Sequence, residues 1–330
     1  MEQRKKDHIE LAFESQISSM DLDRRFNYEP VMKPHLTGGL EPFEFLGKKI
    51  RVPMWVSSMT GGTKMAHKIN HNLARACAEF GMGMGLGSCR IILDSDDHLN
   101  DFNVRDIIGD DLPFFANLGI AQMEELVAAK ALGKVVQLVD KLRADGLIIH
   151  VNPMQESLQP EGDIFKVPAL DTISYVVEHL DMPVIVKAVG QGIGPESLGR
   201  LLKLPLAAVE YGAFGGTNFA KLELMRGDPL KNELFEPLSK IGHDAYQMTE
   251  FVNQIVEQEG PVVCPQIIVS GGIKSFLDGY YLINKTNLPA IYGQASAFLK
   301  YAREDYESLR TFIKFQIKGL EIATAFLKIK

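Results

Sequence analysis

GLIIHVN (146–152) and PVIVKAVG (183–190) are two short runs of apolar, mostly β-branched residues, and each ends in polar or glycine residues. Neither run alternates apolar with polar positions. Such alternation is typical of a strand that has one face in water. Continuous apolar runs instead indicate strands that are covered on both faces, as in a parallel sheet. The two runs therefore predict neighbouring parallel strands joined through a helical segment.

The same strand–helix unit recurs along the chain in both directions. Six further runs are MWVSSMT (54–60), GMGMGLGS (81–88), PFFANLG (113–119), LAAVEYGA (206–213), QIIVSGG (266–272) and AIYGQAS (290–296). Amphipathic segments separate them: one helix is expected over 66–81, ending at Gly81, and another is expected to end at Gly133. Eight such units are typical of a (β/α)8 barrel, or TIM barrel. An open doubly wound sheet is the alternative, but no glycine fingerprint follows the first run.

Length and composition favour one domain. The chain has 330 residues, 46% of them hydrophobic, and no sharp change of composition divides it. We therefore predict a single barrel domain over 1–330 with an N-terminal arm over 1–50. The segment 214–242 after the sixth run is long, glycine-punctuated and mixed in charge. Long connections in compact domains are commonly lids, so we predict a mobile lid there, with an inert insertion as the alternative.

The net charge and the cysteine content indicate which partners and which compartment to expect. The net charge of −7 disfavours binding to nucleic acid or to an anionic membrane face. No apolar stretch approaches the roughly 20 residues that cross a bilayer, and no signal peptide is recognisable at the start. Three cysteines provide no disulfide framework, so we expect reduced thiols and a cytoplasmic protein.

Polar and glycine residues follow nearly every predicted strand, where a barrel carries its active site. The glycine loops SGGI (270–273) and YGQA (292–295) follow the seventh and eighth runs. Glycines let backbone N–H groups approach an anion closely, and this pair of loops is the common phosphate site of such barrels. We therefore predict that a phosphate-bearing ligand binds there.

Lys187 lies inside an otherwise apolar run, in PVIVKAVG. Because burial of an unpaired charge is unfavourable, this lysine must be paired or functional. An ion pair with Glu210, which also points inward on a strand, is the structural alternative. We favour a functional role.

The motifs together resemble type 2 isopentenyl diphosphate isomerase, a flavin-dependent barrel family, over nearly the whole chain. The matching segments are RKKDH (4–8), SSMTGG (57–62), GSCR (87–90), NLG (117–119), HVNPMQESLQPEGD (150–163), KAVGQG (187–192), GGTN (215–218) and SGGI (270–273). The pattern HxNxxQE followed by PEGD is the most specific of these. The sequence departs from the family pattern at Cys89, Ala188 and Lys274, which stand where Gln, Glu and Arg are usual, and in FLDGYYLINK (276–285), which has aromatics where small residues are typical.

The resemblance implies a reaction and its cofactors. The family interconverts isopentenyl diphosphate and dimethylallyl diphosphate, and it needs reduced FMN and Mg²⁺, with NADPH as the reductant of the flavin. Ordinary side-chain acids protonate a plain alkene poorly, so the flavin itself is the expected acid–base group. The family also tends to form symmetric homo-oligomers, so a tetramer or an octamer is expected.

The resemblance also implies roles for individual residues. Substrate contacts are expected from Arg4, Lys5, Arg90, His150, Asn152 and Gln155, and catalytic roles from Gln155, Lys187 and His150. Glu156 would hold the Mg²⁺ that bridges to the diphosphate. The expected FMN contacts are Ser58, Met59, Thr60, Ser88, Asn117, Lys187 and Thr217, with Gly272, Lys274, Tyr292 and Gly293 around the FMN phosphate.

Two other functions are weighed against this one. A flavin-dependent 2-hydroxy-acid oxidase would need a His–Arg pair near the seventh run, and the residues that directly follow Ile267 in that run (IVSGGIK) include neither. A non-catalytic protein that binds flavin or phosphate would account for the glycine loops. It would leave Gln155, Glu156 and the basic N-terminus unexplained.

Overall fold

The protein is a closed barrel of parallel strands. A computed structural model describes residues 2–58, 61–258, 260 and 262–330. Around the barrel the strands follow one another in sequence order, and the last pairs with the first, which confirms the predicted fold. The strands are β4 (Met54–Val56), β5 (Gly83–Gly85), β6 (Phe114–Gly119), β7 (Gly146–His150), β8 (Val184–Lys187), β9 (Ala208–Glu210), β10 (Ile267–Ser270) and β11 (Ala290–Gln294).

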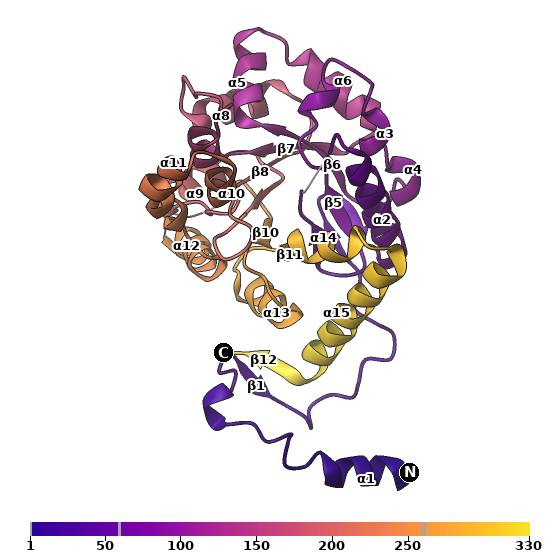
Figure 1. The fold of residues 1–330 in the computed structure, drawn as a ribbon. Coiled ribbons are helices and arrows are strands. Elements are labelled where there is room, and N and C mark those ends of the chain that lie inside the picture. Colours follow the sequence, from indigo (N-terminus) through magenta and orange to yellow (C-terminus); the bar gives the residue numbers. More distant parts are fainter. Residues whose placement is uncertain (1, 59–60, 259, 261) are drawn as a thin grey trace.

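Helices surround the barrel on its outer side, as Figure 1 shows. Nearly every residue of the eight strands is buried, because side chains fill the inside and helices cover the outside. The covering helices are α2 (Lys64–Phe80), α5 (Ile120–Ala128), α6 (Gly133–Leu142), α8 (Ala169–His179), α9 (Pro195–Leu202), α12 (Ala245–Gln258), α13 (Phe276–Lys285), α14 (Ser296–Ala302) and α15 (Tyr306–Phe326).

Local signals fix the ends of the helices. Helix α2 begins after Thr63, whose hydroxyl accepts the Ala66 amide at 3.1 Å, and it ends as predicted at Gly81 with φ 72°. The predicted stop at Gly133 is wrong, because helix α5 already ends at Ala128. Lys130 turns the chain with φ 53°, and Gly133 is the first residue of α6.

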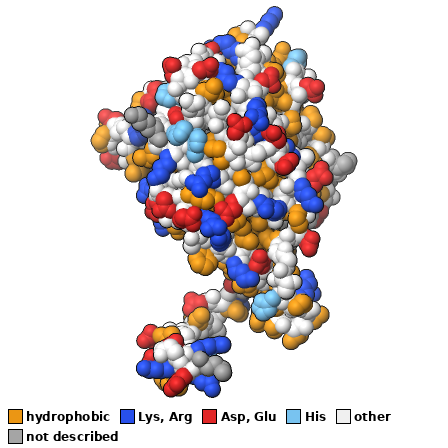
Figure 2. All heavy atoms as spheres, turned by 90° about the vertical axis from the view of Figure 1, so that its right-hand side faces the viewer, with side chains coloured by type: hydrophobic (Ala, Val, Ile, Leu, Met, Phe, Trp, Pro, Cys, Tyr) orange, Lys and Arg blue, Asp and Glu red, His pale blue; other side chains and the backbone are white. Residues whose placement is uncertain are grey.

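The N-terminal arm has two parts with different surroundings. Its first part holds α1 (Glu2–Glu10), the 3-10 helix η1 (Ser19–Asp21) and β1 (Phe26–Tyr28), which pairs antiparallel with β12 (Leu327–Ile329). This ribbon lies beside α13 and α15, and α1 lies farthest from the barrel (Figure 1). Figure 2 shows this part as a projection below the main body. Among the described residues, the hydrogen bonds of residues 2–22 all stay within that segment.

The second part of the arm closes the N-terminal end of the barrel. It is the hairpin β2 (Phe43–Phe45) and β3 (Lys48–Ile50), whose Phe45 and Ile50 are fully buried. Lys48 donates to Asp145 at 2.5 Å and to the carbonyl oxygen of Asp110 at 2.6 Å. The hairpin is thereby bound to the segments that lead into β6 and β7.

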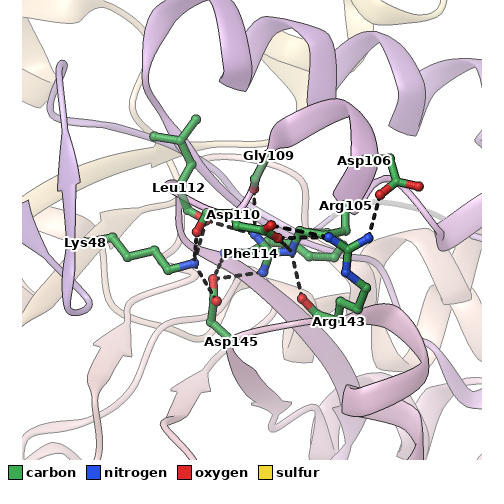
Figure 3. Close-up of polar contacts among 9 residues, drawn as sticks. All are labelled: Lys48, Arg105, Asp106, Gly109, Asp110, Leu112, Phe114, Arg143 and Asp145. Carbon is green, nitrogen blue, oxygen red and sulfur yellow. Dashed lines mark hydrogen bonds and ion pairs between the residues drawn. The ribbon is translucent and has the colours of Figure 1, made fainter.

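An ion network continues from this hairpin around the same end (Figure 3). Arg105, in the short helix α4 (Arg105–Ile108), is 1% exposed and lies 3.0 Å from Asp145. It donates to the carbonyl oxygens of Arg143, Gly109 and Leu112 at 2.7, 2.9 and 3.1 Å. Its guanidinium also lies over the Phe114 ring, 4.9 Å from the centroid. This end of the barrel is therefore a closed, hydrogen-bonded structure.

The segment 214–242 is not an irregular loop. It folds into α10 (Phe219–Arg226), α11 (Pro229–Phe235) and the 3-10 helix η3 (Glu236–Lys240). Asn218 caps α10 by accepting the Lys221 amide at 2.9 Å, and Asp228 caps α11 in the same way. Its mobility stays a prediction. The remaining short elements are η2 (Arg90–Ile92), α3 (Leu99–Phe102) and α7 (Pro153–Leu158).

The cysteines form no disulfide among the described residues, as the sequence predicted. Cys77, Cys89 and Cys264 are free and buried, and burial raises the pKa of the Cys89 thiol to about 12. A thiol in that state is a poor nucleophile, as expected for an inert Cys89. In the part of the chain that the structure describes, no helix has both the length and the apolar character needed to span a bilayer.

Candidate active site

A cavity of about 420 Å³ opens at the C-terminal ends of the barrel strands. Lys187 from β8, Glu210 from β9 and Gly272 after β10 all line it, together with Ser57, Ser58, Thr217, Lys274 and Gly293. The size is that of a site for a small organic ligand. Of the predicted site residues, Ser58, Lys187, Thr217, Gly272, Lys274 and Gly293 line this cavity, whereas Arg90, Asn117, His150, Asn152, Gln155 and Glu156 do not. The convergence of the whole predicted set on one mouth stays a prediction.

The glycine loops form a wall that tolerates no side chain. Gly271 and Gly272 have φ values of 85° and 72°, which favour glycine. A Cβ on Gly271 would lie 2.2 Å from the Ala213 amide nitrogen, and one on Gly272 would lie 2.9 Å from the Phe214 oxygen. Lys274 and Lys300 line the same cavity. Exposed backbone and two cations suit an anionic group such as a phosphate.

Several buried polar atoms at this mouth have no partner among the described residues. They are the hydroxyls of Ser57 and Ser58, both carboxylate oxygens of Glu210, and Oε1 of Gln294. Buried polar atoms in native proteins are nearly always hydrogen-bonded. Because these four residues line one cavity, they indicate a polar ligand that supplies the missing partners.

His150 is held in one orientation beside Lys187. Its Nδ1 lies 2.8 Å from Asn117 Oδ1, and the Asn117 amide nitrogen donates to the Leu86 carbonyl oxygen at 2.9 Å. Since the Asn117 oxygen can only accept, Nδ1 of His150 carries the proton. Burial, followed by the charge of Lys187, lowers the pKa of His150 to about 3. The ring is therefore neutral near pH 7, and its Nε2 is an acceptor.

Helix α7 carries the carboxylate that was expected to bind a metal. Glu156 accepts hydrogen bonds from the Asn152 side chain at 2.7 Å, from the Asp163 amide at 2.9 Å, and from Gln159. A carboxylate has about four lone-pair sites, so one remains free. No cluster of three or more His, Cys, Asp or Glu residues that could hold a metal occurs among the described residues. Arg90 donates to Asp163 at 3.0 Å at the same rim.

Glu223 contacts a predicted site residue, and the sequence did not reveal this contact. It is 3% exposed on α10, and its Oε1 accepts a hydrogen bond from Gln155 Nε2 at 3.2 Å. Arg226 donates to its other oxygen at 2.6 Å. Its segment was expected to be a loop, so no helical face was assigned to it. Lys300 was missed for a related reason, because it follows the YGQA loop by a full helical turn.

Some predicted site residues lie away from the cavity. Arg4 and Lys5 are exposed on α1, outside the barrel. The Tyr292 ring is buried near Gly279 of α13, and its hydroxyl lies 3.5 Å from Gln316 of α15. Ser88 is exposed and does not line the cavity. Met59 and Thr60 lie outside the described residues.

Lys187 and Glu210 do not form the ion pair that was considered as an alternative. The two residues are register neighbours on β8 and β9. Lys187 Nζ nevertheless donates to the Ala188 carbonyl oxygen at 3.0 Å, and neither oxygen of Glu210 has a partner among the described residues. The lysine therefore remains available to a ligand in the cavity.

Fold and site together define a (β/α)8-barrel enzyme with its site at the C-terminal ends of the strands. Solved structures with this fold include a mandelate oxidase with (S)-2-phenylpropionate and a flavocytochrome b2 variant with sulfite bound. Each has a TM-score of 0.59 and 15% identity. The matches cover 93% and 91% of this chain, and 86% and 72% of those chains. Likeness at this identity shows the fold alone, so it does not favour the oxidase alternative.

Sequence relatives identify the family. Proteins named isopentenyl-diphosphate delta-isomerase from Rickettsia felis and a Synechococcus strain are 33% and 34% identical to this chain over 325 and 329 residues. Both alignments cover 97% of this chain, and they cover 91% and 90% of the relatives. No protein-family model matches the chain. The chain belongs to the isopentenyl-diphosphate delta-isomerase family, which confirms the resemblance found in the sequence.

Proposed function

We propose that this enzyme interconverts isopentenyl diphosphate and dimethylallyl diphosphate with reduced FMN as the acid–base group and Mg²⁺ as the clamp on the diphosphate. The observation that supports it best is the cavity itself. Its glycine wall, its cations and its unpartnered polar atoms face one space. His150, the first residue of the HxNxxQE segment, is the register neighbour of Lys187, which lines this cavity.

The residues of the cavity fit FMN. Gly271, Gly272 and Gly293 leave backbone exposed for a phosphate, with Lys274 nearby, and Lys187 supplies a cation for the ring. Bound FMN, reduced by NADPH, supplies an acid–base group strong enough to protonate an alkene, which ordinary side-chain acids do poorly. Ser58 and Thr217 supply hydroxyls on the same walls.

Gln155 orients the reacting part of the substrate in this proposal. Its amide nitrogen is held by Glu223, so the side chain has a fixed direction. An amide is neither an acid nor a base near pH 7. Gln155 therefore positions the alkene and leaves proton transfer to the cofactor. Asn152 and neutral His150 are the expected contacts to the diphosphate side.

Glu156 holds the metal in this proposal. Mg²⁺ prefers oxygen ligands and keeps several waters, so one carboxylate together with the substrate phosphates is sufficient. The fourth lone-pair site of Glu156 suits such single-carboxylate binding. Arg90 and the arm residues Arg4 and Lys5 are the expected cations on the diphosphate. The last two require the arm to fold over the mouth when substrate is bound.

The direct test is turnover under defined conditions. Purified protein with FMN, Mg²⁺, NADPH and isopentenyl diphosphate, without oxygen, is expected to form dimethylallyl diphosphate. Glu156→Gln should lower the rate by at least about 100-fold and abolish its Mg²⁺ dependence. Asp94→Asn removes an exposed carboxylate that pairs with Lys134, so it is the matched control and should keep full activity. Full activity with 5-deazaflavin, which carries carbon in place of N5 and so does not exchange a proton there in this way, would refute the proposed role of FMN.

A further inference from the structure

Glu210 is a buried carboxyl group that the proposed mechanism does not yet use. It is the last residue of β9, is 0% exposed, and lines the cavity. Its register neighbours are Lys187 on β8 and Ile268 on β10. Residues paired in a parallel ladder project to the same face, so Glu210 and Lys187 point together into the barrel mouth.

Neither carboxylate oxygen of Glu210 has a hydrogen-bond partner among the described residues. Other polar groups line the same cavity: the unpartnered hydroxyls of Ser57 and Ser58, and the cations Lys274 and Lys300. His150, the register neighbour of Lys187 on β7, is neutral because its pKa is lowered to about 3. Lys187 is thus the cation aligned with Glu210 in the ladder.

A purely structural carboxylate in this barrel has a different environment. Asp145, at the opposite end, accepts hydrogen bonds from Lys48 at 2.5 Å and from the Phe114 amide at 2.8 Å, and Arg105 lies 3.0 Å from it. A buried carboxylate without donors is destabilising by several kcal/mol. The fold leaves Glu210 in that state at a ligand cavity, which indicates that its partners belong to the loaded site.

We propose that Glu210 is a positioning residue for the flavin site: it turns the Lys187 ammonium toward its own carboxylate and so partly offsets the positive charge that the lysine presents to the flavin ring. This inference rests on the proposed binding of FMN. The lysine ammonium can make this movement, because in the structure it donates only to a carbonyl oxygen of the neighbouring residue, Ala188, and not to another charged group.

The consequence concerns the charge of the reduced flavin. A cation near the ring stabilises the anionic reduced form, and a neighbouring carboxylate opposes that effect. With Glu210 in place, the site therefore favours reduced over oxidised FMN less strongly than Lys187 alone would. Loss of the carboxylate should make the bound flavin easier to reduce, and loss of the lysine should make it harder.

The experiment measures the dissociation constants of oxidised and anaerobically reduced FMN, the midpoint potential of the bound flavin, and its reduced-state absorption spectrum. These readouts need no turnover. Glu210→Gln should raise the preference for reduced FMN about tenfold and shift the spectrum toward the anionic form. Lys187→Met should lower that preference. The double variant should differ from the sum of the two single changes, because the groups interact directly.

Two further variants separate positioning from a role in folding. Glu210→Asp keeps the charge and should stay close to wild type in the reduced-to-oxidised preference. Asp145→Asn removes a partly buried carboxylate at the other end and should leave that preference unchanged. A preference in Glu210→Gln equal to wild type overturns the inference. If that variant does not fold, a Glu210→Asp protein with the shift expected for loss of charge overturns it equally. Wild-type protein that binds no FMN would refute the proposed function itself.

Discussion

The two ends of the barrel handle buried charge in opposite ways. At the N-terminal end, Arg105 donates to three carbonyl oxygens, and its Nη2, which has no hydrogen-bond partner among the described residues, lies 3.0 Å from the Asp145 carboxylate (Figure 3). Asp145 in turn accepts hydrogen bonds from Lys48 and from the Phe114 amide. At the C-terminal end, Glu210, Ser57 and Gln294 carry buried polar atoms with no partner among the described residues. The comparison indicates that the N-terminal end stabilises the fold. The polar groups at the C-terminal end are left unpaired by the fold and can bind a ligand.

Replacement of Arg105 should have the largest effect on stability. Arg105→Met leaves Asp145 without its guanidinium and frees three carbonyl oxygens, so we expect a loss of about 3–5 kcal/mol in the free energy of unfolding. Urea unfolding of the FMN-free protein measures it. Arg143→Met, which removes a half-exposed partner of Asp106 and Asp110, should lose far less, because solvent screens those pairs. Equal losses in the two variants would contradict a larger contribution of the buried Arg105 network to stability.

Replacement of Gly272 should weaken FMN binding about tenfold. Alanine at φ 72° is strained by about 1–2 kcal/mol, and its Cβ would lie 2.9 Å from the Phe214 oxygen. Titration with FMN, followed by flavin fluorescence, measures the affinity. Gly39→Ala carries similar strain at φ 82° with no atom within 4 Å of the Cβ. It should leave FMN binding unchanged, and a similar loss in both variants would refute a phosphate cradle.

Removal of the Ser57 hydroxyl should stabilise the FMN-free protein. Ser57 is 4% exposed and its hydroxyl has no partner among the described residues, so Ser57→Ala should gain about 1 kcal/mol. FMN affinity should fall at the same time. Ser239 is equally buried, but its hydroxyl donates to the Glu236 carbonyl oxygen at 2.7 Å. Ser239→Ala should therefore destabilise, and a change of the same sign in both variants would contradict the contrast between the two ends.

Acidification should reveal the buried state of His150. The pKa is lowered from its ordinary 6.5 to about 3, so between these values the unfolded chain binds a proton that the folded chain does not. Stability due to the neutral ring is full above pH 6.5 and decreases as the pH falls toward 3. From pH 7 to 6 the loss is at most about 0.7 kcal/mol, and His150→Gln should lack it. NMR shifts of the ring that titrate near pH 6.5 would contradict this.

The sequence predicted the barrel because its signal is repeated and local. All eight apolar runs contain observed strands, and Gly81 ends α2 where expected. The helices inside 214–242 were missed because glycines and mixed charge hide a short amphipathic face. The prediction that a helix ends at Gly133 was wrong because glycine can begin a helix as well as follow one. The turn between α5 and α6 is instead made by Lys130 with φ 53°.

The site residues that the sequence predicted correctly are glycines and charged or polar residues at or just after the end of a strand. Lys187, Thr217, Gly272, Lys274 and Gly293 all line the cavity. Contacts between distant segments were not predictable, because no local pattern records them. The bond from Gln155 to Glu223 and the outward packing of Tyr292 depend on how whole helices dock.

His150, Lys187 and Glu210 share one row of the barrel only because three strands pair in parallel register. Consecutive members of this row are separated along the chain by a complete crossover connection. A fragment that ends before β9 therefore lacks the row, however well its first strands and helices form. Ligand binding should appear late in refolding, after secondary structure is complete, and half-barrel fragments should regain it only when they reassociate.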